Sequence, residues 1–452
     1  MSDKKDAIYD AKTLGYPKMF VLGLQHMFAM FGATVLVPAL TGLSVSATLL
    51  FAGLGTLLFH FLTKGKVPAF LGSSFAFIGG YAAIAPFIED GDSKLPNTAL
   101  LPYACLGVAA AGCLYLVLAG LIRAFGQKKV MRFFPPIVTG PIIIAIGLTL
   151  SSSAIDNCKQ NWIVAVLAIL VVIVCNIYGK GMIKIVPIIL GVFVSYIAAL
   201  PFGLVDFTAV KEAAWIGLPF QMENTVFSIF KSPDSSLIAT AIITIMPIAL
   251  ATMVEHIGDI SAISSTTNRN FIEDPGLHRT LLGDGLATIL ASLFGAPANT
   301  TYGENTGVLS LTKVYDPVVI RIAAVCAIVV SFSPKFAALI ASMPAATIGG
   351  VSIVLYGMIS AVGVRNVVEN QVDFSRSRNI IIAALILGLS IGINYSGAIT
   401  FSLGEVNISL SGLAVGALVG IILNAVLPLE EKDYKGASKA FTTEEEEAEA
   451  KK

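Results

Sequence analysis

The sequence predicts an all-α polytopic membrane protein with 14 transmembrane segments, arranged as two inverted seven-segment repeats. Three observations favour this fold class. Hydrophobic residues make up 56% of the chain and charged residues 13%, whereas a soluble domain carries about 25% charged residues. Apolar runs long enough to cross about 30 Å of hydrocarbon recur along the chain. Similar proline–glycine motifs also recur seven runs apart.

Fourteen apolar runs are expected, at 19–40, 45–62, 67–86, 99–122, 133–153, 162–178, 183–205, 237–264, 281–296, 299–315, 317–333, 337–362, 379–394 and 408–428. Because seven is odd, two consecutive repeats of seven must cross the bilayer in opposite directions. Pro135 stands five residues before Gly140 in run five, and Pro344 stands five residues before Gly349 in run twelve. The alternative is chance similarity between glycine-rich membrane segments.

The charges outside the runs predict the orientation. Residues 1–18 lack the apolar core of a signal peptide, so the first spanning helix is expected to direct insertion. With the N-terminus inside, the inner tail and loops up to residue 378 hold eighteen Lys and Arg residues and the outer loops five. This asymmetry predicts that both termini are cytoplasmic. Residues 429–452 are predicted to form an acidic, solvated cytoplasmic tail.

The composition offers no basis for a cofactor, a metal site or nucleic-acid binding. The formal net charge is zero, and the five cysteines include no CxxC pair. The segment around His256 reads EHxxD, which is not the HExxH pattern of a zinc site.

The stretch 298–313, ANTTYGENTGVLSLTK, places the carboxylate of Glu304 inside a membrane-like sequence. Residues 300–302 suit a short extended segment, Gly303 permits a tight turn, and Glu304 can open a helix. A helix that starts inside the membrane directs its unpaired N–H groups at the bilayer centre, as the broken helices of secondary transporters do. The alternative is a re-entrant loop in which Glu304 only caps a helix.

Run eight contains a second acidic pair, Glu255 and Asp259. Their spacing of four residues places both carboxylates on one helix face. Two carboxylates this close in a low dielectric cannot easily both ionise, so we expect the site to hold a proton near neutral pH. Asp259 could instead lie beyond the hydrocarbon edge, and His256 between them could simply pack locally.

Polar residues in other runs add candidates. Ser74 and Phe75 in run three could present backbone amides and an aromatic face to a planar ligand. His26 in run one is expected to make an interhelical hydrogen bond. Asp284 in run nine is either a buried partner or a charge at the cytoplasmic edge, and the sequence does not separate these.

Four stretches carry a family resemblance: QHMFAMFGATVLVPALTGL (25–43), GKVPAFLGSSFAFI (65–78), EDPGLHRTLLGDGLATILASLFGAPANTTYGENTGV (273–308) and IGGVSIVLYGMI (348–359). They resemble the nucleobase–ascorbate transporter family, and within it the bacterial branch that transports uracil. The resemblance covers nearly the whole chain except the tails and some outer loops. Its most specific part is the signature that begins at Glu304.

The resemblance implies a core domain of segments 1–4 (19–124) and 8–11 (237–335), and a gate domain of segments 5–7 (125–236) and 12–14 (336–428). It implies a short antiparallel strand in segments 3 and 10, and a homodimer formed through the gate domain. The predicted substrate-binding residues are Glu255, Glu304, Phe75, Gly303, Ala33, Ser74 and Tyr302. The predicted proton-coupling residues are Glu255, Asp259 and Glu304.

The implied function is proton-coupled import of uracil across the cytoplasmic membrane of a bacterium, by movement of the core against the gate domain. Asp259 departs from the pattern, because a bacterial relative in the uracil branch has histidine there and purine-transporting relatives more often have aspartate. Those purine relatives usually have Gln where this chain has Glu304, which favours the pyrimidine branch. The alternatives are a xanthine or urate carrier, an anion exchanger and a membrane-embedded enzyme; the last lacks a visible nucleophile or metal set.

Overall fold

The computed structural model describes residues 7–90, 93–403 and 406–428. Its helices are α1 (Tyr16–Thr41), α2 (Val45–Leu62), α3 (Ile78–Ile84), α4 (Leu101–Phe125), α5 (Gln127–Met131), α6 (Pro136–Cys158), α7 (Trp162–Tyr178), α8 (Met182–Ile185), α9 (Pro187–Ala199), α10 (Thr208–Glu212), α11 (Ser235–Ile245), α12 (Ala249–Thr267), α13 (Leu277–Leu293), α14 (Gly303–Thr312), α15 (Pro317–Ser331), α16 (Pro334–Ala341), α17 (Ala345–Glu369), α18 (Ser377–Ser396) and α19 (Gly412–Val426). Its strands are β1 (Leu71–Ser73), β2 (Ile88–Asp90), β3 (Ser93–Leu95), β4 (Asn299–Thr301), β5 (Ile399–Leu403) and β6 (Val406–Leu410). The predicted acidic tail, 429–452, lies outside the described residues.

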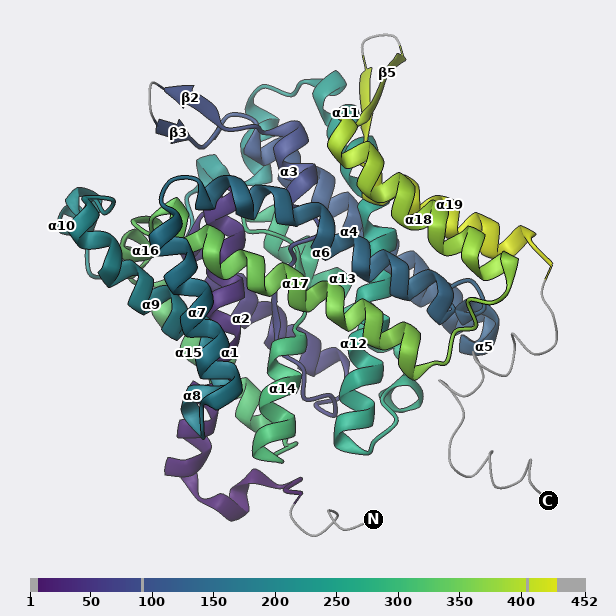
Figure 1. Cartoon of the computed structure of the whole chain (residues 1–452), viewed down its shortest axis with the longest axis horizontal. Helices are drawn as coiled ribbons and strands as arrows, with labels where there is room; N and C mark the ends of the chain where they lie inside the picture. The colour runs from purple at the N-terminus through teal and green to yellow at the C-terminus, as the bar shows by residue number, and fades with distance from the viewer. Residues whose placement is uncertain (1–6, 91–92, 404–405, 429–452) are drawn as a thin grey trace.

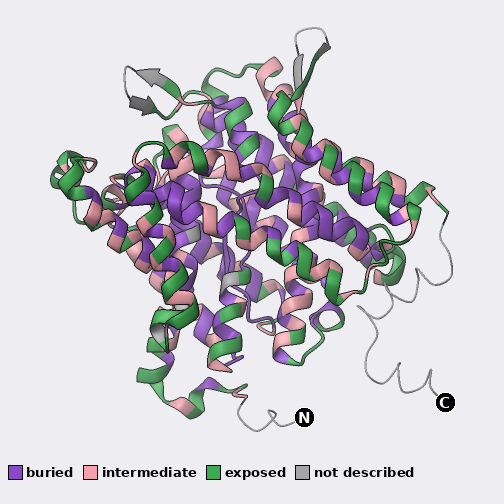
Figure 2. Cartoon of the chain, viewed as in Figure 1, coloured by how far each residue is buried: buried purple, intermediate pink, exposed green. Residues whose placement is uncertain are grey.

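The chain is mostly helical, as the composition predicts. Among the described residues, seven helices are long and apolar enough to cross a membrane, or eight if the pair α15 and α16, bent by 90°, forms one span. Three shorter apolar helices lie at Trp162–Tyr178, Pro187–Phe202 and Gly412–Val426. Buried residues concentrate in the middle of this bundle, and the outer faces of peripheral helices such as α18 are exposed (Figure 2). Exposed apolar faces of this kind suit contact with lipid.

Several predicted runs differ from the structure. The run at 183–205 is divided between α8 and α9. The run at 337–362 is interrupted between α16 and α17, where Pro344 caps α17 in an extended conformation and disfavours helix at the residue before it. The run at 408–428 begins too early, because residues to Leu410 form strand β6, which pairs antiparallel with β5. This hairpin and the β2–β3 hairpin lie at the edge opposite the N-terminal residues (Figure 1).

Helices α6 and α17 pack at very close range near the centre of the bundle (Figure 1). A Cβ atom on Gly147 of α6 would lie 2.2 Å from the carbonyl oxygen of Tyr356, and one on Gly349 of α17 would lie 2.6 Å from that of Ala154. Only glycine permits this approach of two backbones. Pro135 and Pro344 are the residues directly before the two helices, and both have the same extended conformation.

The N-terminal residues from Ile8 onward are packed against the bundle. Ile8 donates its N–H to the Lys313 carbonyl (2.8 Å) and accepts from the Tyr315 N–H (2.8 Å). The Tyr9 hydroxyl donates to the carbonyl of Thr267, the last residue of α12, at 2.8 Å. This segment therefore joins the end of α12 to the end of α14.

Candidate functional site

Strands β1 and β4 lie in two segments where extended chain interrupts the helices, and the two strands pair with each other. The strands run antiparallel, with Leu71 opposite Thr301 and Ser73 opposite Asn299. Ser74 N–H donates to the Ala298 carbonyl (2.8 Å), which extends the pairing by one further bond. Each strand is followed by a short helix, α3 or α14, and the N-terminal end of a helix carries a partial positive charge.

Tyr302 fixes this junction. Its hydroxyl donates to the Ser73 carbonyl (2.8 Å) and lies 3.3 Å from the Thr34 hydroxyl of α1. The hydroxyl of Ser73 lies 3.1 Å away on the same side. The Tyr302 ring is almost fully buried, so its hydrogen bonds hold α1 and both strands in one arrangement.

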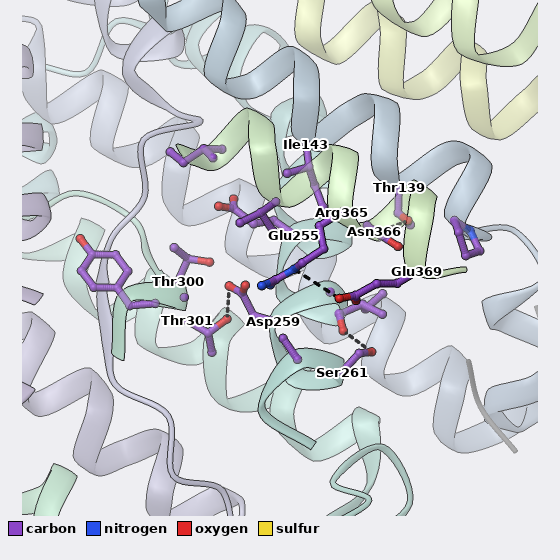
Figure 3. Close-up of a pocket in the computed structure, with 18 of the residues that line it drawn as sticks. Thr139, Ile143, Glu255, Asp259, Ser261, Thr300, Thr301, Arg365, Asn366 and Glu369 are labelled. Carbon is purple, nitrogen blue, oxygen red and sulfur yellow. Dashed lines mark hydrogen bonds and ion pairs between the residues drawn. The ribbon is translucent and has the colours of Figure 1, made fainter. Parts of the chain in front are cut away.

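Helix α12 presents both Glu255 and Asp259 to a cavity of about 520 Å³. This volume lies within the range of about 300–1,000 Å³ that is typical of small-molecule sites. The hydroxyl of Thr301, on β4, donates to Asp259 Oδ2 at 3.1 Å. Figure 3 shows the carboxylates of Glu255 and Asp259 on the same side of α12, facing the space beside Thr300 and Thr301.

The cavity has two walls of different character. One wall is formed by α12, β4 with the start of α14, and Phe75 after β1; the other is formed by α6 and α17. The second wall contributes Pro136, Thr139, Ile143, Leu355, Met358, Ile359, Val362, Arg365, Asn366, Glu369 and Asn370. Arg365 is the cation among the described lining residues, and its Nε lies 3.8 Å from Glu369 Oε1 (Figure 3).

His256 faces away from the cavity and into the protein. Its Nδ1 lies 3.2 Å from Asp284 Oδ2 of α13, and both side chains are fully buried. The same nitrogen lies 3.4 Å from the Thr301 hydroxyl. Asp284 is therefore a buried partner and not a charge at the cytoplasmic edge.

His26 makes the interhelical contact expected of it. Asn305 Nδ2 donates to the His26 carbonyl (3.1 Å) and lies 3.1 Å from His26 Nδ1. Both residues are buried. This contact fixes α14 against α1 immediately after the first residues of α14.

The structure brings five of the predicted site residues to one cavity: Phe75, Glu255, Asp259, Tyr302 and Gly303. Ser74 is buried next to them but is not among the residues that line the cavity. The backbone of Glu304 lies in the first turn of α14, directly after Gly303, and that of Ala33 lies in α1. The side chains of Glu304 and Ala33 lie outside the described part of the chain.

Sequence reasoning missed the cavity residues of α17 and the role of Thr301. The predicted run ended at 362, which left Arg365 and Glu369 as loop charges, although α17 continues to Glu369. The signal was present, because an Arg and a Glu four residues apart favour another helical turn. The partner of Asp259 could not be read from sequence, since it depends on the placement of β4 against α12.

A bundle of apolar helices with a cavity between broken segments and two glycine-packed helices defines a multi-pass membrane protein of the transporter class. The chain belongs to the Permease family, whose model matches residues 17–399.

Curated relatives match over almost their whole length. The uracil permease of Bacillus caldolyticus is 40% identical over 430 residues, which cover 93% of this chain and 94% of that protein. A probable uracil permease of Haemophilus influenzae is 40% identical over 427 residues, covering 92% and 96%. A putative pyrimidine permease of Escherichia coli is 38% identical over 440 residues, covering 94% and 93%.

Two solved transporter structures share the fold at low sequence identity. The structure of SLC26A9 gives a TM-score of 0.62 at 14% identity and covers 92% of this chain and 66% of its own. The transmembrane domain of the cyanobacterial bicarbonate transporter BicA gives 0.55 at 16% identity and covers 92% and 98%. These likenesses concern the fold alone.

Proposed function

We propose that this protein is a proton-coupled uracil symporter of the cytoplasmic membrane. The observation that carries the proposal is the acidic pair Glu255 and Asp259, which faces a cavity beside the paired strands of two broken helices. Curated relatives at about 40% identity carry the name uracil permease, which supports uracil as the substrate.

The proposed topology has fourteen segments as two inverted repeats of seven. Strands β1 and β4 would be the extended parts of segments three and ten, and α6 and α17 would be segments five and twelve. The antiparallel pairing of the two strands and the equivalent proline starts of the two helices support an inverted relationship. Both termini are proposed to be cytoplasmic, and two copies to associate through the gate domain.

The proposed core domain comprises 19–124 and 237–335, and the gate domain comprises 125–236 and 336–428. The two walls of the cavity follow this division, since α12, β4 and Phe75 belong to the first and α6 and α17 to the second. A site between two such bodies suits alternating access, in which one body moves against the other.

Uracil is planar, with N–H donors and C=O acceptors at its edge. In the proposed site Glu255 and Glu304 accept from N–H groups, and the backbone amides near Phe75 and Gly303 donate to C=O groups. The Phe75 ring would cover one face of the base. The site would reject analogues that lack a partner, because its own buried polar groups would remain unpaired.

Proton coupling would use the carboxylates of Glu255, Asp259 and Glu304. A proton held among these carboxylates would favour substrate loading from outside, and its loss would favour release inside. The names of the curated relatives, uracil or pyrimidine permeases, do not favour the alternative of a xanthine or urate carrier.

Uptake into proteoliposomes tests this function. An inwardly directed proton gradient should concentrate labelled uracil inside the vesicles, chemically unchanged, and unlabelled xanthine should compete poorly. Uptake that ignores the proton gradient would contradict the coupling, and strong competition by xanthine would contradict the assignment of uracil. Glu255→Gln is expected to abolish accumulation, because a neutral amide cannot carry the proton.

A further inference from the structure

The cavity runs from a buried end to an exposed end, and its charges are not evenly spread. Phe75 and Thr300 at one end are almost fully buried, whereas Ser265 and Glu369 at the other are exposed. The exposed end lies near the ends of α12 and α17, on the side of the N-terminal segment that binds Thr267 (Figure 1). With the proposed orientation, this opening faces the cytoplasm.

Arg365 lines the cavity between its buried end and its exposed end. It belongs to α17, and in Figure 3 its guanidinium group extends across the cavity toward Asp259 of α12, with Glu369 on its other side. A substrate that leaves the buried end must therefore pass a cation held on one wall opposite a carboxylate on the other.

The present partner of Arg365 holds it weakly. The distance of 3.8 Å to Glu369 Oε1 exceeds hydrogen-bond length, and the two side chains are 57% and 67% exposed. Exposed pairs of this kind contribute little to stability. A planar guanidinium can instead make a bidentate pair with a carboxylate if the two walls approach.

Asp259 is placed to receive that pair. The Thr301 hydroxyl at 3.1 Å fixes its Oδ2 atom at the cavity wall. An ionised Asp259 attracts Arg365, whereas a protonated one presents no charge to it. Other titratable groups around Asp259 also set its protonation: Glu255 and His256 on α12, Tyr302 after β4, Tyr115 on α4, Asp284 on α13 and Glu369 on α17.

We propose that Arg365 is a positioning residue for transport, which closes the cytoplasmic opening by pairing with ionised Asp259 and releases it when Asp259 takes up a proton. This inference rests on the proposed function. It explains why transport is coupled to a proton: the cytoplasmic opening stays closed when the carrier holds substrate but Asp259 has no proton. The empty carrier that has lost its proton inside can close there and return.

A reporter cysteine tests the closing pair of Arg365 and Asp259, here called the lock, without any substrate. Ser261 lines the cavity, so the variant Ser261→Cys places a reporter thiol there. A membrane-impermeant maleimide added to inside-out vesicles would measure how accessible this thiol is through the cytoplasmic opening. The protein without the substitution gives the background labelling. Each labelling rate is divided by that of a free cysteine thiol at the same pH, because the thiolate fraction rises with pH and speeds labelling by itself. This relative rate should fall by about fivefold between about pH 5.5 and about pH 8.5. With Arg365→Gln or Asp259→Asn, the relative rate should stay high across that range.

Two further variants separate the lock from general damage. Arg365→Lys keeps a positive charge and should keep part of the pH dependence. Glu369→Gln removes only the present partner and should keep all of it. Because Arg365 is exposed, Arg365→Gln should retain the wild-type thermal midpoint, and Asp259→Asn tests the same pair from the opposite wall.

A relative labelling rate that falls with pH in Arg365→Gln as in the wild type would overturn the proposal, as would a pH dependence of this relative rate that survives in Asp259→Asn. Failure of wild-type protein to bind uracil would instead contradict the proposed function while leaving the labelling result intact. In proteoliposomes, Arg365→Gln should equilibrate uracil across the membrane without accumulating it, and accumulation equal to wild type would again overturn the lock.

Discussion

The hydroxyl of Thr301 donates a hydrogen bond of 3.1 Å to Oδ2 of Asp259. This contact connects strand β4, in the broken stretch, to the helix that carries the acidic pair. The two regions are separated by about forty residues, so neither determines the geometry of the other through the chain alone. The acidic pair and the broken helix therefore act as one unit.

Thr301→Val should slow uracil uptake by about tenfold or more, because a hydrogen bond to a charged group contributes about 1.5–3 kcal/mol. The substitution keeps the β-branched shape that suits β4. Thr301→Ser retains the hydroxyl and should retain most of the rate. Initial uptake rates in proteoliposomes measure both, and equal rates for the two variants would show that the hydroxyl has no role.

The pair His256–Asp284 should stabilise the fold. Removing one member of a buried pair typically costs about 3–5 kcal/mol, since the other is left uncompensated, so Asp284→Ala should lower the thermal midpoint strongly. A double-mutant cycle with His256→Gln and Asp284→Asn measures the coupling. Costs that add within about 0.5 kcal/mol would show that the two side chains are independent.

Gly349→Ala should destabilise the protein by about 1–3 kcal/mol through overpacking, because the new methyl would lie 2.6 Å from the Ala154 carbonyl oxygen. Gly357 provides a matched control on the same helix, since a Cβ there would meet nothing within 4 Å. Gly357→Ala should be neutral or stabilising by up to about 1 kcal/mol. Thermal midpoints in detergent compare the two, and equal losses would argue against the close packing of α6 and α17.

Tyr9 should hold the N-terminal segment against α12 and α14. Its ring lies 5.4 Å from that of Tyr315, and the Arg269 guanidinium lies 4.3 Å from its centroid. Tyr9→Ala should therefore cost about 2 kcal/mol, whereas Tyr9→Phe should cost only about 1 kcal/mol for the lost hydrogen bond to Thr267. Thermal unfolding of the two variants gives the comparison, and a harmless Tyr9→Ala would mean that the segment is not anchored by this residue.

The sequence predicts the helical membrane class well because hydrophobic length is a strong local signal. The runs at 45–62 and 162–178 coincide with α2 and α7. The break at Gly303 and the shared face of Glu255 and Asp259 were also predictable, since turn chemistry and helical spacing depend on nearby residues.

Other features depend on contacts between distant segments. The β5–β6 hairpin was missed because an apolar strand and the start of a buried helix look alike over a few residues. The buried position of Asp284 could not be predicted, because its contact with His256 depends on how α13 packs against α12. Arg365 belongs to the site because α17 continues beyond the apolar run to Glu369, and its place at the cavity depends on how α17 packs against distant segments.

Uracil binding to purified protein, measured by calorimetry for the wild type, Glu304→Ala and Glu255→Gln across a pH series, tests the central claim most directly. The account predicts that the wild type binds uracil with an affinity that changes with pH, that Glu304→Ala does not bind it, and that Glu255→Gln loses the pH dependence. Binding of uracil by Glu304→Ala as tight as by the wild type would contradict the assignment of the site.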